Sequence, residues 1–296
     1  MSIDLSLLPP PSVVEPLDFE TILATIKADV LAVVPELADV LALESEPATK
    51  LCEVFAYREL LLRARINNAA KATMLAHAED TDLDNLAVLF GVQRLPDEKD
   101  DRLRRRTQLS LESYSTAGPT KSYLYHALSV SSDVLDAYVD SPAPGAVRIV
   151  ILAVPSDDYP HGVPSQALLD ATYSAVSAED VRPLTDAPLT VAAEVIFYSV
   201  AASLVCLPGV GQAAVIQAAI EAVTAYVNDQ FRLGYDITVS GLKAALRRPG
   251  VARVNLTSPA LPAAESDDEQ DVLVAVSGWQ AAFCTSITVT PGGVSA

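Results

Sequence analysis

The sequence predicts an α+β multidomain protein, in which an all-helical N-terminal region is followed by two small, similar α/β modules. Apolar residues keep helical spacing through about the first 115 residues. After that point strand-like apolar runs alternate with amphipathic helices, and segments 122–142 and 240–259 resemble each other. At 296 residues the chain is long enough for two or three domains, each with its own core.

Composition and charge exclude several classes of partner. The chain has 20 Lys and Arg against 38 Asp and Glu, which gives a net charge of −18. Such a surface repels nucleic acid and anionic membranes, because phosphate groups bind to basic faces. The sequence has no run of roughly 18 apolar residues and no basic start typical of a secretory signal. We therefore expect a soluble protein of the cytoplasm, with no nucleic acid partner and no membrane insertion.

Residues 1–17 form a Pro-rich arm that we expect to be extended. The run Pro9-Pro10-Pro11 and Pro16 prevent a regular helix over so short a stretch. Two interpretations stay open from composition alone. The arm is either a disordered tail or a strand that lies on a partner.

Residues 18–115 form the expected helical domain. Asp18 is the predicted N-cap of a first helix, which Pro35 ends. After a short helix comes a long one, with Ser45 as its predicted N-cap. Pro47 fits its first turn, where a missing N–H costs nothing.

The long helix carries two apolar seams, one more than a helix lying on its own domain needs. At about 100° per residue the first seam contains Leu51, Phe55, Leu62, Ile66 and Ala69. The second seam contains Val54, Tyr57 and Leu61, and Arg58 and Arg65 fall between the seams. We therefore expect this helix to pack against two neighbours, of which one belongs to another chain. The candidate interface residues on it are Val54, Tyr57, Arg58, Leu61 and Arg65.

Four arginines lie on the last helix of this region, beyond a short helix for which Gly91 is the predicted C-cap. They are Arg102, Arg104, Arg105 and Arg106. Nucleic acid fits poorly, because the chain is acidic and no aromatic residues are interleaved. Two interpretations stay open: a solvated helix face, or a patch that binds an acidic protein neighbour such as another copy of this chain. The four arginines complete the set of candidate interface residues.

The segment 115–120 is the best domain boundary in the sequence. A Gly-Pro pair ends the preceding helix, and Thr120 is the predicted N-cap of the next one. The first α/β module, 116–200, then contains a helix, two strands, a second helix and the start of a β-rich run. The second module, 201–296, ends in further strands after an acidic loop at 265–271.

The two modules are predicted to be similar because each contains a helix that leads into a strand ending in Ser-Pro. This pattern occurs at 122–142 and again at 240–259, with Leu and Ala-Leu at matching places. Chance similarity between two short amphipathic segments is the alternative.

The acidic run that starts at Asp80 begins like a calcium loop. Asn85 stands where the turn glycine belongs, however, and Gly91 stands where the bidentate glutamate belongs. Acidic residues also favour a helix N-terminus without any metal. We therefore interpret the run as the start of a helix.

The segment Gly209-Val210-Gly211 follows a strand and opens a helix, as a dinucleotide fingerprint does. Pro208 crowds this turn, and the acidic residues downstream lie inside the helix instead of ending a second strand. A simple strand-to-helix turn is the better interpretation, and no cofactor is expected.

Histidines and cysteines give no catalytic or metal-binding pattern. The histidines His77, His126 and His161 are single, and no G-x-S-x-G motif accompanies them. The cysteines Cys52, Cys206 and Cys284 are far apart in apolar runs, as expected for buried thiols. No catalytic residue is therefore expected. The alternative is an uncharacterised cytoplasmic enzyme whose site lies between the α/β modules and gathers His126 or His161 with carboxylates.

Several motifs in combination resemble the baseplate assembly protein J family, over essentially the full chain. In the helical part they are Leu8-Pro-Pro-Pro, Glu15-Pro-Leu-Asp-Phe-Glu, Ala42-Leu-Glu-Ser-Glu-Pro, Tyr57-Arg-Glu-Leu-Leu-Leu-Arg-Ala-Arg-Ile-Asn, Asp82-Leu-Asp-Asn-Leu-Ala, Leu89-Phe-Gly-Val and Asp101-Arg-Leu-Arg-Arg-Arg. Beyond it they are Ser115-Thr-Ala-Gly-Pro, Ser141-Pro-Ala-Pro-Gly, Glu179-Asp-Val-Arg-Pro-Leu-Thr-Asp and Phe283-Cys-Thr-Ser-Ile-Thr-Val-Thr. Each motif is weak alone, and the set is specific.

The resemblance implies a structural role in the wedge of a contractile-tail baseplate, in a phage or in a phage-tail-like bacteriocin such as an R-type pyocin. It implies a helical bundle with a second copy of the chain and another baseplate wedge protein, and C-terminal domains that link wedges into a ring. The further implied partners are a sheath-initiator subunit and the central hub or spike proteins. The family contributes no catalytic residues. A wedge subunit is assembled in the bacterial cytoplasm and becomes part of the tail baseplate of the released particle.

Overall fold

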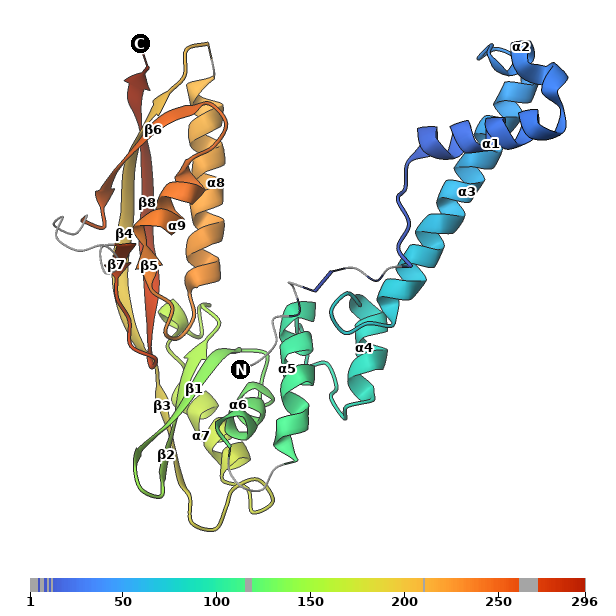
Figure 1. The fold of residues 1–296 in the computed structure, drawn as a ribbon. Coiled ribbons are helices and arrows are strands. Elements are labelled where there is room, and N and C mark those ends of the chain that lie inside the picture. Colours follow the sequence, from blue (N-terminus) through green and yellow to red (C-terminus); the bar gives the residue numbers. More distant parts are fainter. Residues whose placement is uncertain are drawn as a thin grey trace. The chain divides into compact units, whose positions relative to one another are not determined.

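The computed structural model describes residues 5, 8–9, 11, 13–114, 119–209, 211–260 and 271–295 (Figure 1). The chain forms two compact units. The helical unit consists of Met1–Arg94 and Glu98–Gln108, and the α/β unit consists of Leu95–Asp97 and Leu109–Ala296. Helices come first and small mixed sheets follow, which confirms the predicted α+β class. Three features of the sequence prediction lie outside the described residues: segment 115–118, most of the acidic loop, and Val210.

The helical unit is built around one long helix, α3. Its elements in chain order are α1 (Phe19–Val33), η2 (Pro35–Leu37), α2 (Ala38–Leu41), α3 (Pro47–Ala72), α4 (Asp80–Val88) and most of α5 (Asp100–Ser113). α1 packs against α3. In Figure 1, α1 and α2 lie beside the N-terminal part of α3, and α4 follows at its other end.

The predicted N-cap of the first helix is confirmed, and that of the long helix is wrong. The Asp18 carboxylate accepts a hydrogen bond from the backbone N–H of Glu20 at 3.1 Å. The N-cap of α3, by contrast, is Glu46, whose side chain makes no capping hydrogen bond. The reason is Pro47, because a proline at the first helical position makes the residue directly before it the cap and leaves Ser45 outside.

The same shift by one residue occurs at α6. Pro119 is its N-cap, and Thr120, the predicted cap, is its first helical residue. Gly91, the predicted C-cap, lies two residues beyond Leu89, the C-cap of α4, and has a φ of +69°. The N–H of Val92 then donates to the carbonyl of Ala87 at 3.1 Å, which closes the helix end.

Glu15 of the Pro-rich arm contacts α3 of its own chain. The side-chain oxygen of Asn67 accepts from the N–H of Glu15 at 2.9 Å, and the Asn67 amide donates to the Glu15 carbonyl at 2.8 Å. Arg63 also pairs with the Glu15 carboxylate at 3.1 Å. This contact depends on one buried asparagine on α3. A strand of the arm on a partner stays a prediction.

The first part of the α/β unit contains a three-stranded mixed sheet. Its elements are α6 (Thr120–Leu128), β1 (Val134–Ala143), β2 (Ala146–Ala153), η3 (Pro160–Gly162), α7 (Gln166–Val176) and β3 (Ala187–Ala192). The central strand β2 is antiparallel to β1 and parallel to β3. Helices and sheet share a core that includes Tyr123, Leu128, Ile149, Ile151 and Val176.

The second part contains a longer sheet of the same kind. Its elements are β4 (Glu194–Cys206), α8 (Gln212–Gln230), β5 (Ile237–Thr238), α9 (Val239–Leu246), β6 (Val251–Ser258), β7 (Val272–Val274) and β8 (Gln280–Val294). The central strand β4 is antiparallel to β6 and parallel to β8, and β5 pairs with β7. The core includes Val200, Leu204, Val223, Leu242 and Leu246.

The two sheets have the same strand pattern but a different order along the chain. In each, the central strand has one antiparallel and one parallel neighbour, and a helix leads into the antiparallel strand. These pairs, α6–β1 and α9–β6, contain the segments that resemble each other in the sequence. The pair precedes the central strand in the first sheet and follows it in the second. The chain passes between the sheets at Ala193, so the predicted module boundary at residue 200 falls within β4.

The two sheets of the α/β unit are joined by a shared core. Val150 and Leu152 of β2 cluster with Phe231, Leu233 and Ala281 from the second part. The buried carboxylate of Asp136 on β1 accepts from the N–H of Leu233 at 3.2 Å, and the Arg148 guanidinium lies 4.9 Å from the centre of the Trp279 ring. Within the described part of the chain, no helix combines the length and the apolar character that a membrane crossing requires.

Candidate interaction surface

The buried residues of α3 are small or polar. They are Thr49, Cys52, Ala56 and Asn67, which lie on one side of the helix. Small side chains at a helix contact allow the neighbouring helix to approach closely. The side of α3 that packs within the helical unit is therefore the side that carries the least apolar bulk.

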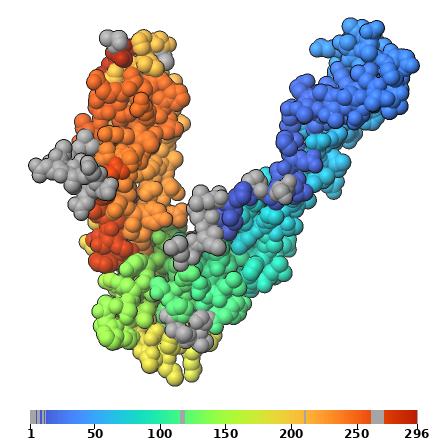
Figure 2. All heavy atoms as spheres, viewed as in Figure 1, coloured from blue at the N-terminus to red at the C-terminus, as the bar shows by residue number. Residues whose placement is uncertain are grey.

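Both predicted apolar seams of α3 are exposed. The exposed fractions are 60% for Leu51 and 62% for Phe55 in the first seam, and 56% for Val54 and 55% for Tyr57 in the second. Leu61, Leu62 and Ile66 are exposed as well. The expectation that one seam packs within this chain is wrong, because α1 occupies the small-residue side instead. In Figure 2 atoms of α3, light blue to cyan, form part of the visible surface of the helical unit.

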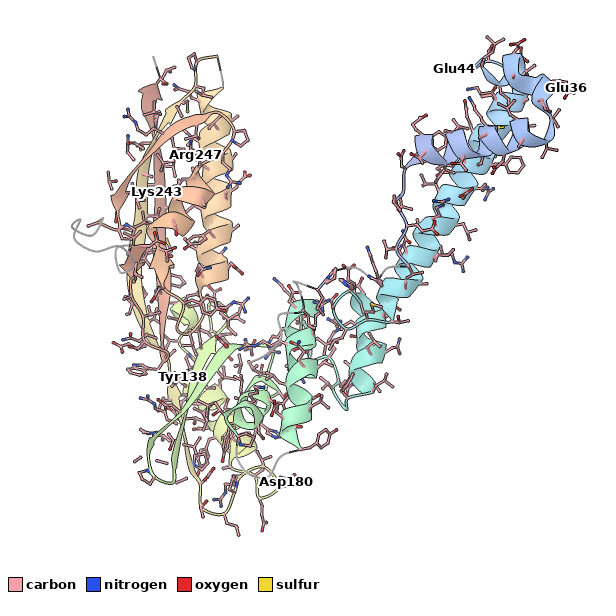
Figure 3. The ribbon with its side chains drawn as sticks, in the orientation of Figure 1. Glu36, Glu44, Tyr138, Asp180, Lys243 and Arg247 are labelled. Atoms are coloured by element: carbon pink, nitrogen blue, oxygen red, sulfur yellow. The ribbon has the colours of Figure 1, made fainter. Side chains whose placement is uncertain are left out.

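We call this surface the α3 face. It consists of the two seams and of the arginines between them: Leu51, Val54, Phe55, Tyr57, Arg58, Leu61, Leu62, Arg65 and Ile66. Figure 3 shows side chains projecting along the whole length of α3. A contiguous apolar surface of this kind is typical of a site for another protein.

Three of the four arginines of α5 bind residues of the helical unit. Arg102 and Arg106 both pair with the buried carboxylate of Glu98, at 2.7 and 2.6 Å. Arg104 donates to the carbonyls of Leu75 and Ala78 at 2.8 and 2.7 Å and pairs with Asp101. Arg105 lies half-buried on the same helix. Because Arg106 is buried, the cluster is not simply a solvated helix face.

A second set of ion pairs extends this network to α4. Arg94 pairs with Asp84 at 2.6 Å and with Asp100 at 2.7 Å, and it also donates to the carbonyl of Glu98. The backbone N–H of Asp80 donates to Asp100 and, together with Arg94, lowers the pKa of that carboxyl group. The acidic run at the start of α4 therefore binds an arginine of its own chain. For the pair between Glu98 and Arg102, the sequence offered one signal: the two residues are four positions apart, which is the spacing of an ion pair along a helix.

The histidines and cysteines do not converge on a reactive centre in the described residues. Burial lowers the pKa of His126. The charge of nearby Asp180 acts in the opposite direction and offsets only part of this effect. The nearest aromatic rings to His161 are those of Phe197 and Phe283, at 5.1 and 4.9 Å between ring centres. Among these residues no group of three or more His, Cys, Asp or Glu is arranged to hold a metal ion. The free cysteines are Cys52, Cys206 and Cys284.

A helical unit that leaves such an apolar face uncovered is typical of a subunit of a larger protein assembly. Comparison with known families agrees. Three family models match in succession: the Baseplate J-like N-terminal domain at 44–100, the Baseplate J-like central domain at 115–193 and the Baseplate J-like protein C-terminal domain at 198–289. The chain belongs to the baseplate J-like family, which confirms the resemblance seen in the sequence.

One related protein aligns with nearly the full length of the chain. Baseplate protein J of Escherichia phage P2 is 38% identical over 311 residues, and the alignment covers 98% of this chain and 98% of that protein. The α3 face lies within the region matched by the N-terminal family model.

Proposed function

We propose that this chain is a structural, non-enzymatic wedge subunit of a contractile-tail baseplate, and that the α3 face joins it to other chains in a helical bundle. The observation that carries the proposal is the row of large apolar side chains exposed along one helix. Family membership supports the structural role. In this proposal the bundle contains a second copy and another wedge protein, and the sheath initiator and the central hub or spike proteins are further partners.

The energetics favour a bundle of several chains over a simple pair. Completing the burial of seven half-exposed apolar side chains contributes about 1 kcal/mol each, or roughly 7 kcal/mol. Association costs about 4–15 kcal/mol in lost freedom of motion. One contact through the α3 face is therefore marginal, and contacts with more than one helix make the assembly stable.

The α/β unit links wedges into the ring in this proposal. Its two sheets share a core, so the unit can transmit a displacement as one body. The wedge is assembled in the bacterial cytoplasm and remains in the baseplate of the released particle. The proposal includes the tails of phages and of phage-tail-like bacteriocins.

The test is co-expression of the chain with the other baseplate proteins of its particle, followed by measurement of the mass of the complex. We expect Tyr57→Glu with Leu61→Glu to leave a folded protein by circular dichroism but to prevent complex formation, because two charges would then enter an apolar interface.

The matched control is Val88→Glu with Leu89→Glu, which places the same charges on two exposed apolar residues at the C-terminal end of α4. The control should assemble normally. A wild-type chain that stays a lone monomer beside the other proteins, or a Tyr57/Leu61 variant that still assembles, contradicts the proposal.

A further inference from the structure

Arg58 and Arg65 lie on the midline of the α3 face. They are seven residues apart, so they point in nearly the same direction, roughly 10 Å apart along the helix axis. Val54 and Leu61 lie on one side of them, and Phe55 and Leu62 lie on the other. Both arginines are exposed. Two positive charges thus stand in the centre of an apolar surface.

Neither arginine has a partner in the described part of the chain. The residues three and four positions away from each are apolar, except for Asn68. The nearest carboxylates of the helix are engaged elsewhere, since Glu53 pairs with Lys50 at 2.9 Å and Glu59 pairs with Arg63. The charges of Arg58 and Arg65 are therefore available to another chain.

Covering the α3 face buries these two charges. Burial of an unpaired charge is strongly unfavourable, whereas a carboxylate in bidentate contact with an arginine compensates for most of the lost hydration. The same face of a second copy cannot supply that carboxylate. Two copies of α3 could pair in parallel and in register, or antiparallel about a point midway between Arg58 and Arg65. Either pairing would place the four guanidinium groups of the two copies close together.

We propose that the helix covering the α3 face belongs to a different baseplate protein and carries two carboxylates one heptad apart, which pair with Arg58 and Arg65. This inference rests on the proposed function and names the chemistry of the partner at that surface. The partner helix has acidic residues along its midline and apolar residues on both sides, complementary to the α3 face. A second copy of this chain then enters the bundle through another surface.

The experiment is a charge reversal in cells that produce the complete tail particle. Arg58→Glu with Arg65→Glu should lower the yield of particles by at least about 100-fold, because breaking a buried ion pair costs about 3–5 kcal/mol. Arg58→Lys with Arg65→Lys keeps the charge but loses the second hydrogen bond of each pair, so its yield should lie between those of the wild type and the charge-reversed variant.

Two controls separate this effect from net charge and from folding. Arg247→Glu with Arg253→Glu changes the charge equally on exposed arginines of the α/β unit, where Figure 3 labels Arg247. Because that unit is proposed to link wedges, the comparison uses the mass of the co-expressed wedge complex, which this control should leave unchanged and the Arg58/Arg65 variant should not. The purified Arg58/Arg65 variant should unfold at the wild-type temperature, since both side chains are exposed. If it does not fold, Arg58→Gln with Arg65→Gln takes its place, with the same expected loss of particles.

Selection of revertants from the charge-reversed variant identifies the occupant. We expect Asp or Glu changed to Lys or Arg in a helix of another baseplate protein. Compensating changes in carboxylates of this chain would show that a second copy covers the face and would overturn the inference. Normal assembly of the charge-reversed variant also overturns it. If that variant assembles while Tyr57→Glu with Leu61→Glu does not, the α3 face remains the assembly surface and only the acidic helix is refuted.

Discussion

Glu98 brings two arginines together at the corner between α4 and α5. Its carboxylate is buried and pairs with both Arg102 and Arg106, and Arg106 also donates to the carbonyl of Gln93 at 3.3 Å. Burial lowers the pKa of Arg102, and the charge of Glu98 works in the opposite direction. Because charges in such a place are stable only when paired, the geometry of this corner depends on one carboxylate.

We expect Glu98→Ala to lower the free energy of unfolding of the helical unit by about 3–5 kcal/mol, since the buried Arg106 loses its carboxylate. Chemical denaturation measures this change. The control is Glu59→Ala, which removes a half-exposed ion pair with Arg63 and should cost less than about 1 kcal/mol. Similar losses for the two variants would mean that the Glu98 cluster does not hold the corner together.

At the scale of elements, the arm and α3 are joined through Asn67. The two hydrogen bonds between the Asn67 amide and the backbone of Glu15 resemble those between paired strands, although one partner is a side chain. His77, near the end of α3, lies 3.4 Å from the carbonyl of Pro9. These contacts hold the described residues Pro9 and Glu15 of the arm against their own chain.

Asn67→Ala should release the arm and lower the free energy of unfolding of the helical unit by about 1–2 kcal/mol. The arm should then be cleaved faster in limited proteolysis, while circular dichroism shows an intact helix. Asn68→Ala is the matched control, because Asn68 is the exposed neighbour on the same helix. Equal cleavage of the arm in both variants would mean that Asn67 does not hold it.

At the scale of the whole molecule, the α/β unit behaves as one folding body in our interpretation. The sheets meet in a shared core, and Asp136 satisfies the backbone N–H of Leu233 across the junction. The chain also crosses from β3 to β4 through the single buried residue Ala193, whose N–H donates to the carbonyl of Ile151 at 2.9 Å. Such a junction couples the stability of the two sheets.

We expect Asp136→Ala to destabilise both sheets together, by about 1–3 kcal/mol, because a buried N–H loses its acceptor. Hydrogen exchange should show equal loss of protection in β2 and in α8. The control, Asp170→Ala, removes an exposed hydrogen bond with Gln166 on α7 and should have little effect on α8. Loss of protection confined to β1–β3 would show that the sheets unfold independently.

The sequence by itself determined the fold class, the family, the position of most helices and the two seams of α3. These features depend on residue types at short spacing, such as the apolar period from Leu51 to Ile66 or the turn at Gly91. Such periods repeat within one or two helical turns, so they can be recognised in the sequence without knowledge of the tertiary contacts.

Only the tertiary structure decided which side of α3 is covered, where the arginines of α5 bind and what the arm contacts. The apolar seams predicted burial, but the buried side chains of α3 include the small residues Cys52 and Ala56, and small side chains let a neighbouring helix approach closely. Glu98 and Arg106 are 8 residues apart, and Glu15 and Asn67 are 52 residues apart, so no local period encodes these two pairs. The two sheets likewise share a strand pattern in a different order, which only long-range pairing reveals.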